Sequence, residues 1–242
     1  MPSSSNTRSS TPDYWAVVPA AGIGKRMQAD RPKQYLEIEG HTVLEHTLRR
    51  LDAVAELAGI VVALSKEDEY WPTLDLQLQK PLWIAEGGVE RCHSVANALQ
   101  LLGQEADDND WVLVHDAARP CVRVEDIQRL MRQLQDDPVG GLLAMPVRDT
   151  MKRAEANQRV VSTEERAGLW HALTPQLFRL GMLRHALEQA IEDEMLVTDE
   201  ASAMELADYQ PLLVAGHADN IKITRAEDLV LAEFYLRQQE AV

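Results

Sequence analysis

The residues best suited to phosphate chemistry follow the first apolar run of the chain, at Ala20, Ala21 and Gly22. Small residues directly after a strand let the backbone approach a phosphate closely, and their amide groups can form an anion-binding nest. The segment lacks the third glycine of a dinucleotide fingerprint and the Lys-Ser or Lys-Thr ending of a Walker loop. It therefore predicts a phosphate loop of another type, with a plain tight turn that needs glycine as the alternative.

Basic residues accompany this loop in a chain that is otherwise strongly acidic. The whole sequence has 24 Lys and Arg against 39 Asp and Glu, a net charge of −15. Between Pro19 and Gln34, however, the only acid is Asp30, and the bases are Lys25, Arg26, Arg31 and Lys33. Isolated surface cations are usually solvated, but fixed cations beside a triphosphate stabilise the charge that develops when its α-phosphorus is attacked. The cluster therefore favours transfer chemistry on a nucleoside triphosphate.

A second glycine turn, GGVERCHSV, leaves one predicted strand and enters a predicted helix. Gly88 leaves room for a flat base against the backbone, and Ser94 either hydrogen-bonds a base edge or caps the helix. Cys92 and His93 have no evident partner that would complete a nucleophile and base pair. The turn is thus a candidate nucleotide contact, and its thiol and imidazole receive no role.

An acid and a base, Asp116 and Arg119, follow the strand predicted at Trp111 to His115. Open α/β sheets bind ligands at this edge, where the carboxyl ends of the strands meet. A carboxylate there suits Mg²⁺ held directly or through water, or a substrate hydroxyl. The alternative is an ion pair between Asp116 and Arg119 that only shapes the turn.

The elements that position these residues alternate between short apolar runs and stretches of helical period, which predicts an α/β, Rossmann-like fold with a mainly parallel central sheet. We expect a disordered tail over 1–13, a single domain over 14–242, and a projecting β-hairpin arm over about 149–172, with a floppy surface insertion as the alternative to the arm. The predicted strands are 15–18, 60–64, 82–85, 111–115, 142–147 and 212–215. The predicted helices include stripes at Leu44, Leu48, Leu51 and Ala55 and at Ile127, Leu130, Met131 and Leu134, with further helices over 175–191, 198–207 and 225–239.

Composition excludes several classes of protein. No apolar run reaches the roughly 18 residues that a membrane helix requires. A net charge of −15 disfavours binding to nucleic acid. Two cysteines without metal-ligand spacing argue against a disulfide framework or structural zinc, so we expect a cytoplasmic protein.

Seven segments, in order, resemble the 2-C-methyl-D-erythritol 4-phosphate cytidylyltransferase family of the non-mevalonate isoprenoid pathway. The resemblance covers nearly everything from Trp15 to Leu236. Its segments are PAAGIGKRM with Pro32-Lys33-Gln34, GGVERCHSV, VHDAARP, Pro146 to Thr150, Trp170 to Gln176, TDEA and ADNIKIT. The resemblance implies transfer of CMP from CTP to the 4-phosphate oxygen of the polyol with release of pyrophosphate, assisted by Mg²⁺.

The resemblance also assigns roles residue by residue. Arg26 and Lys33 match residues that stabilise the pentacoordinate transition state, while Arg166, on the arm, and Lys222 match residues that hold the substrate phosphate. The family's arm is its dimerisation element, which implies a homodimer in which Arg166 completes the partner's site. The remaining matches divide into nucleotide contacts at Ala20, Ala21, Gly22, Gly88 and Ser94, and polyol contacts at Asp116, Arg119, Thr150 and Thr174.

Two departures and three alternatives accompany this interpretation. Val89 stands where some relatives carry a polar residue that reaches the nucleotide, and the chain lacks the second domain of bifunctional relatives, so we expect one activity. The nearest alternative is a cytidylyltransferase acting on another polyol phosphate such as ribitol 5-phosphate. A non-catalytic nucleotide-binding protein would not require the cation cluster, and an NAD-linked dehydrogenase would require the missing GxGxxG spacing.

Overall fold

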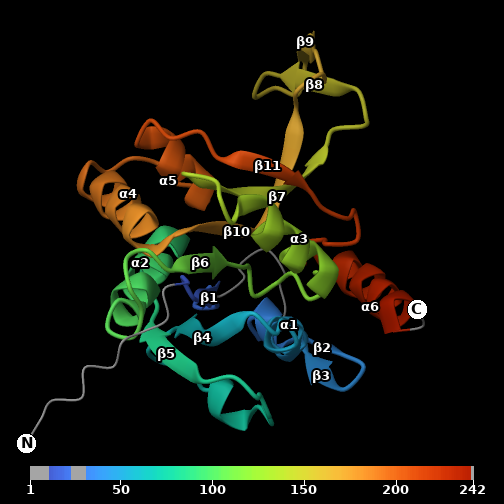
Figure 1. The fold of residues 1–242 in the computed structure, drawn as a ribbon. Helices are drawn as coiled ribbons and strands as arrows, with labels where there is room; N and C mark the ends of the chain where they lie inside the picture. The colour runs from blue at the N-terminus through green and yellow to red at the C-terminus, as the bar shows by residue number, and fades with distance from the viewer. Residues whose placement is uncertain (1–10, 23–30, 241–242) are drawn as a thin grey trace, which may run out of the picture.

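A seven-stranded sheet forms the centre of the computed structural model, which describes residues 11–22 and 31–240. The strand order is β11-β7-β10-β6-β1-β4-β5, and only β10 runs antiparallel to its neighbours within this sheet (Figure 1). The carboxyl ends of the other strands therefore meet at one edge. The strands are β1 (Tyr14–Pro19), β4 (Leu57–Leu64), β5 (Leu82–Glu86), β6 (Trp111–Val114), β7 (Gly140–Pro146), β10 (Trp170–Arg179) and β11 (Leu212–Ala215).

Helices cover both faces of the sheet, because side chains of a strand alternate between its two faces. Along β1, Ala16 and Val18 belong to one buried apolar cluster, and Trp15 and Val17 belong to another. The first cluster includes residues of α1 (Val43–Asp52) and α3 (Val124–Leu134). The second includes residues of α2 (Arg91–Leu102), α4 (Leu180–Glu192) and α5 (Glu200–Leu206). The α/β prediction is confirmed.

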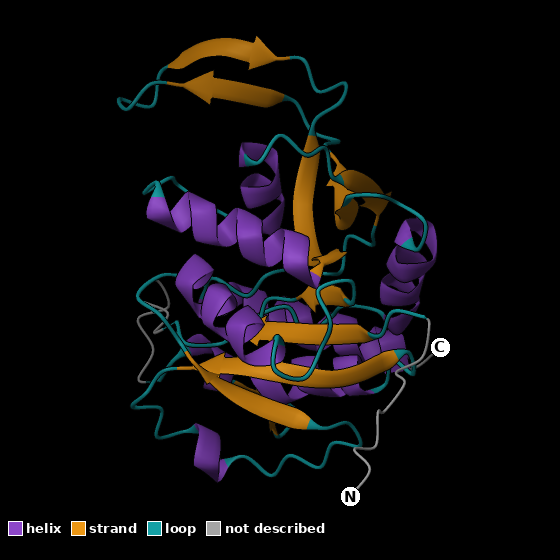
Figure 2. Ribbon diagram, turned by 60° about the vertical axis from the view of Figure 1, so that its left-hand side comes forward, coloured by secondary structure: helices purple, strands orange, loops and turns teal. Residues whose placement is uncertain are grey.

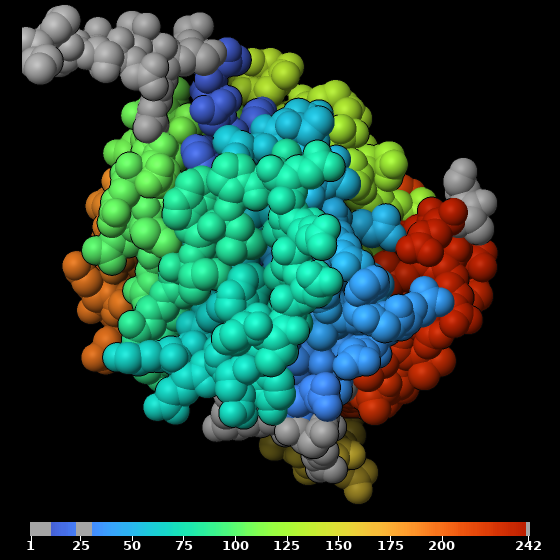
Figure 3. Space-filling view, turned by 90° about the horizontal axis from the view of Figure 1, so that it is seen from below, coloured from blue at the N-terminus to red at the C-terminus, as the bar shows by residue number. Residues whose placement is uncertain are grey.

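The last helix, α6 (Ala226–Glu240), packs Ala232 and Leu236 into a third buried cluster with Ile38 of β2 (Glu37–Ile38). A tight turn joins β2 to β3 (His41–Thr42), and Gly40 in this turn has φ of +79°, a conformation that favours glycine. The connection between β4 and β5 includes the 3₁₀ turn η2 (Trp71–Thr73) and packs against the first cluster. Seen from below, this connection covers the middle of the face, and the blue segment that includes β2 and β3 lies between it and the red α6 (Figure 3).

A two-stranded hairpin projects from the sheet, as the sequence predicts (Figure 2). Its strands are β8 (Met151–Ala154) and β9 (Val160–Glu164), joined by a turn in which Gln158 has φ of +64°. The amide of Val147 donates to the carbonyl of Leu169 at 2.9 Å, which closes the base of the arm. In the described part of the chain, no helix is both long enough and apolar enough to cross a bilayer.

Two predicted helices differ from the structure. The helix predicted over 175–191 begins only at Leu180, because the residues before it form the end of β10 between β6 and β7. The stripe predicted through Ala55 ends earlier, because α1 stops at Asp52 and Val54 is the next buried side chain. Residues 1–10 of the predicted tail lie outside the described residues.

Candidate active site

A cavity of about 570 Å³ opens at the edge where β1, β5 and β6 end. Side chains and backbone from five separate segments line it: 19–22, 33–34, 88–94, 116–118 and 222–224. The lining includes the residues predicted for nucleotide binding and three predicted charged residues: Ala20, Ala21, Gly22, Gly88, Ser94, Lys33, Asp116 and Lys222. The fold thus brings together residues that are up to 202 positions apart, from Ala20 to Lys222.

Gln34 holds the first loop of the cavity, Ala20 to Gly22, in place. The sequence alone assigns this residue no role of its own. Its side-chain amide donates to the carbonyl of Ala20 at 2.6 Å and to that of Gly22 at 3.1 Å. These bonds fix the backbone of the loop against the 3₁₀ turn that contains Gln34. Gly87 brings the second loop against the first, because a Cβ added there would lie 2.2 Å from the Cβ of Ala21.

Ser94 connects the second loop to α2, but it does not cap the helix as one interpretation of the sequence expects. Its Oγ accepts from the amide of Gly88 at 3.0 Å and donates to the carbonyl of Glu90 at 3.2 Å. The cap position belongs to Glu90, and Ser94 lies one turn inside the helix. The hydroxyl therefore fixes the glycine turn, while Ser94 still lines the cavity.

Lys33 and Lys222 approach the cavity from opposite ends of the sequence. Lys33 begins the 3₁₀ turn η1 (Lys33–Tyr35), and its Nζ donates to the carbonyl of Ile223 at 3.1 Å. Lys222 belongs to the segment between β11 and α6, and its Nζ lies 2.8 Å from Oδ2 of Asp116. The hydrogen bond from Lys33 to Ile223 thus holds Lys33 next to the segment of Lys222, and both lysines line the cavity.

Asp116 is almost fully buried and is surrounded by positive groups. Its Oδ1 accepts from Nε of Arg91 at 3.0 Å, and its Oδ2 lies 2.8 Å from Lys222 and 3.5 Å from Nε of Arg119. Burial would raise the pKa of this carboxyl, but the charges of Arg91, Lys222 and Arg119 hold the pKa well below its usual range. The ion pair with Arg119 therefore exists, and it is one part of a larger network.

Arg91 and Glu200 complete this network, and the sequence assigns neither a role in the site. Nη1 and Nη2 of Arg91 donate to the two carboxylate oxygens of Glu200 at 2.7 and 3.0 Å, a bidentate pair. Glu200 is only 1 % exposed and is the first residue of α5, whose N-cap is Asp199. The guanidinium thus joins the end of β6 to α5.

A smaller cavity of about 180 Å³ shares a wall with the first. Arg91, Asp116 and Lys222 line both. The smaller cavity adds two residues predicted to contact a polyol, Arg119 and Thr174, together with neighbours from β10 and α5. The site therefore has two compartments separated by the charged network around Asp116.

Among the described residues, two of the predicted site residues lie outside both cavities. Thr150 and Arg166 are exposed and line neither cavity; Arg166 donates to the backbone carbonyl of Arg148 at the base of the arm. Their roles stay predictions that involve the arm. Arg26 lies outside the described residues.

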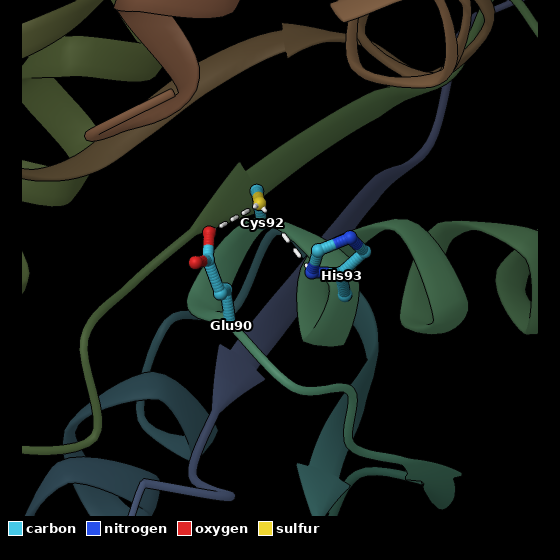
Figure 4. A group of neighbouring side chains, drawn as sticks. All are labelled: Glu90, Cys92 and His93. Carbon is cyan, nitrogen blue, oxygen red and sulfur yellow. Dashed lines mark hydrogen bonds between the residues drawn. The ribbon is translucent and has the colours of Figure 1, made fainter. Parts of the chain in front are cut away.

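The side chains of Glu90, Cys92 and His93 gather in the first turn of α2 (Figure 4). Sγ of Cys92 lies 3.9 Å from Oε2 of Glu90 and 3.8 Å from Nδ1 of His93. Burial raises the pKa of the thiol, which favours the protonated form over the thiolate that binds metal. We interpret the group as a hydrogen-bonded cluster beside the nucleotide loop.

The mainly parallel sheet, the glycine loops at its carboxyl edge and the cationic two-compartment cavity define a nucleotidyltransferase-type α/β protein. Residues 14–238 match the model of the 2-C-methyl-D-erythritol 4-phosphate cytidylyltransferase family, IspD. The chain belongs to this family. A Pseudomonas entomophila protein of that name is 55% identical over 90% of this chain and 93% of its own length.

Solved structures give the same result. The crystal structure of a 4-diphosphocytidyl-2C-methyl-D-erythritol synthase matches with a TM-score of 0.82 and 38% identity, over 94% of this chain and 100% of the other. The Francisella tularensis 2-C-methyl-D-erythritol 4-phosphate cytidylyltransferase matches with a TM-score of 0.80 and 37% identity, over 92% and 99%. The fold and family expectations from the sequence are confirmed.

Proposed function

We propose that this protein transfers CMP from CTP to 2-C-methyl-D-erythritol 4-phosphate, giving 4-diphosphocytidyl-2-C-methyl-D-erythritol and pyrophosphate. The observation that carries the proposal is the pair of cavities that share Arg91, Asp116 and Lys222. A transfer enzyme needs two adjoining sites, with cations where the phosphates meet. Family membership supplies the identity of the two substrates.

The larger cavity suits the nucleotide, because Ala20, Ala21 and Gly22 offer a small-residue loop and Gly88 leaves its surface open. The smaller cavity suits the polyol phosphate. A 4-phosphate oxygen then attacks the α-phosphorus of CTP in line, a new P–O bond forms, and the bond to the bridging oxygen of the β-phosphate breaks. Lys222 lies on the wall that the two cavities share and Lys33 lines the larger cavity, and their positive charges offset the charge that develops in this step.

We propose that Mg²⁺ arrives on the phosphates of CTP. As a direct ligand, Asp116 fits poorly, since both of its oxygens already face cationic side chains within 3.0 Å, Arg91 on one and Lys222 on the other. Such an environment repels a divalent cation. We therefore propose that the carboxylate of Asp116 positions the side chains of Lys222, Arg91 and Arg119.

The direct test supplies the protein with CTP, Mg²⁺ and either 2-C-methyl-D-erythritol 4-phosphate or ribitol 5-phosphate, and measures pyrophosphate release. We expect a clear preference for the methylerythritol compound. A preference for the ribitol compound would replace the proposed substrate by its nearest alternative. Release with neither compound, together with tight CTP binding, would favour a non-catalytic nucleotide-binding protein.

Removing one loop cation should slow transfer without unfolding the protein. We expect Arg26→Ala or Lys33→Ala to lower kcat by about 100-fold or more, the loss seen when a group that stabilises transition-state charge is removed. For Lys33→Ala the unfolding free energy should fall by only about 1 kcal/mol, because the half-buried ammonium loses its hydrogen bond to the carbonyl of Ile223. Steady-state kinetics and thermal unfolding check both statements, with Lys66→Ala, at an exposed lysine outside both cavities, as the matched control. A near-normal kcat would contradict the assigned roles.

We further propose a homodimer formed through the arm. Apolar side chains stand exposed on it, including Val160 at 62 % and Val161 at 60 %, and such surface usually marks an interface. Arg166, which lines neither cavity of its own subunit, would then serve the partner's site.

Shared sites predict complementation between inactive subunits. We expect Arg166→Ala to raise KM for the polyol phosphate, and mixed dimers of Arg166→Ala with Arg26→Ala to recover activity in the site that keeps both arginines. The measurement is turnover of mixed dimers isolated with two affinity tags. If verified mixed dimers recover nothing, the arm does not complete the partner's site.

We propose a cytoplasmic location. Both cysteines, Cys92 and Cys121, are buried free thiols, and a reducing compartment keeps thiols in this state.

A further inference from the structure

His115 is a fully buried imidazole that the proposed transfer does not use. It directly follows β6, is 0 % exposed, and contacts Thr174, which lines the smaller cavity. Its Nε2 lies 3.1 Å from the backbone carbonyl of Arg119, and its Nδ1 lies 3.0 Å from Oγ1 of Thr174. The same Oγ1 accepts from the amide of Asp116 at 3.1 Å. One hydroxyl therefore joins three groups of the site.

These contacts fix where the protons lie. A carbonyl oxygen only accepts hydrogen bonds, so Nε2 of His115 must carry the proton that points to Arg119. In a neutral imidazole the other nitrogen is then an acceptor, so Nδ1 must receive the hydroxyl proton of Thr174. Burial lowers the pKa of His115 to about 4, which keeps the ring neutral at physiological pH. The hydroxyl group of Thr174 therefore donates its proton to Nδ1 of His115 and has no proton left to donate to a ligand.

The remaining capacity of Thr174 is one oxygen lone pair, since a hydroxyl has one donor and two acceptor positions. Its donor goes to His115, and one acceptor position goes to the amide of Asp116. Thr174 lines the smaller cavity together with the donors Arg91, Arg119 and Lys222. These three cationic side chains suit a phosphate group of the ligand. The free lone pair of Thr174 suits a ligand group that donates a hydrogen bond, such as a hydroxyl.

We propose that His115 is a positioning residue that makes Thr174 an obligatory hydrogen-bond acceptor, so that the smaller cavity selects a phosphorylated substrate by a hydroxyl group that donates to Thr174. This inference rests on the proposed function for the location of the polyol. It adds the direction of the hydrogen bond that distinguishes an alcohol from a ketone or ether at that position. A carbonyl there would place two acceptors against each other and leave both unpaired.

The test uses two substitutions of His115 that damage the Arg119 contact equally. In His115→Asn the side-chain oxygen takes the place of Nδ1 and still accepts from Thr174, whereas in His115→Leu no acceptor remains. Thr174→Val removes the hydroxyl at similar volume, and Thr174→Ser retains it. We measure kcat and KM for methylerythritol phosphate and for its monodeoxy and keto analogues with each variant.

In the wild type, one monodeoxy analogue should lose about tenfold in kcat/KM, the cost of an unpaired buried acceptor. His115→Asn and Thr174→Ser should keep this ratio, and Thr174→Val should bring it close to one. In His115→Leu the hydroxyl of Thr174 is free to turn and donate. The analogue that carries a ketone in place of the substrate hydroxyl should therefore gain in kcat/KM relative to the parent substrate in His115→Leu, but not in His115→Asn. An unchanged ratio in Thr174→Val would overturn the inference, even while turnover of the parent substrate upholds the proposed function. Absence of all turnover in the wild type would instead overturn the proposed function.

A second measurement does not depend on activity or on folding of a variant. The ¹⁵N NMR shifts of His115 in the wild-type protein should show a protonated Nε2 and an unprotonated Nδ1 at neutral pH. The opposite tautomer, or a charged ring, would leave Thr174 free to donate and would overturn the inference.

Discussion

Lys222→Ala should lower kcat/KM for the polyol phosphate by about 100-fold or more. The ammonium group lines both cavities and lies 2.8 Å from Oδ2 of Asp116. Its removal takes away a fixed positive charge at the shared wall, where the attacking phosphate and the α-phosphate of the nucleotide approach each other. Steady-state kinetics with each substrate varied in turn would measure this loss.

Two control substitutions make the result specific. Lys222→Arg retains the charge at a different shape and should recover part of the activity. Lys66→Ala, which removes an exposed lysine outside both cavities, should leave kinetics unchanged. If Lys222→Ala has no larger effect than Lys66→Ala, the ammonium does not act on the reacting phosphates.

Arg91→Ala should lower the unfolding free energy by about 3–5 kcal/mol, the cost of removing one partner from a buried ion pair. Within the described contacts, the carboxylate of Glu200 pairs with Arg91 and is only 1 % exposed. The substitution leaves this charge buried and unpaired. Chemical denaturation should give the free-energy change, and the melting temperature should fall by about 10 °C.

The double variant separates the pair from the rest of the network. Glu200→Gln removes the stranded charge, so Arg91→Ala combined with Glu200→Gln should be more stable than Arg91→Ala alone. Equal stability of the two would mean that the pair is not the source of the loss. Activity should stay low in both, because Oδ1 of Asp116 has lost the donor that holds it.

Much of the fold follows from patterns that local chemistry makes visible. The runs of β1 and β4 are apolar and β-branched because these strands are buried on both faces, and parallel strands of this kind are readily predicted. The stripe of α3 has the helical period because Ile127, Leu130 and Leu134 pack against the sheet. The arm was predictable because a long polar segment interrupts this alternation.

The strand β10 was not predictable by the same means. Leu173 and Leu177 continue the spacing of Leu180 and Leu183 in α4, so the helical pattern extends backwards into a strand. Pro175 lies within the strand, at a shift of register between Ala172 and Gln176, a position where strands tolerate proline. The pairing with β6 and β7, which the sequence does not show, makes these residues a strand and not a helix.

The site divides in a similar way. Glycines and charges at strand ends indicate Gly22, Lys33 and Asp116, because their types and positions suggest phosphate chemistry directly. Arg91 and Glu200 are 109 positions apart, and neither stands out among the many charged residues of the chain. Their pairing depends on how α2 and α5 meet over the sheet, which is a property of tertiary packing.

The hydrogen bond between Val147 and Leu169 closes the arm at its base, and Thr174 lies five residues beyond that closure, inside the body of the sheet. The hairpin between these two residues is consequently an exchangeable module. A chimera that receives residues 148–168 from a relative would replace Thr150 and Arg166 but keep the residues that line both cavities. The arm and the cavities can therefore be exchanged separately, and the substrate preference of such a chimera shows which of the two parts sets it.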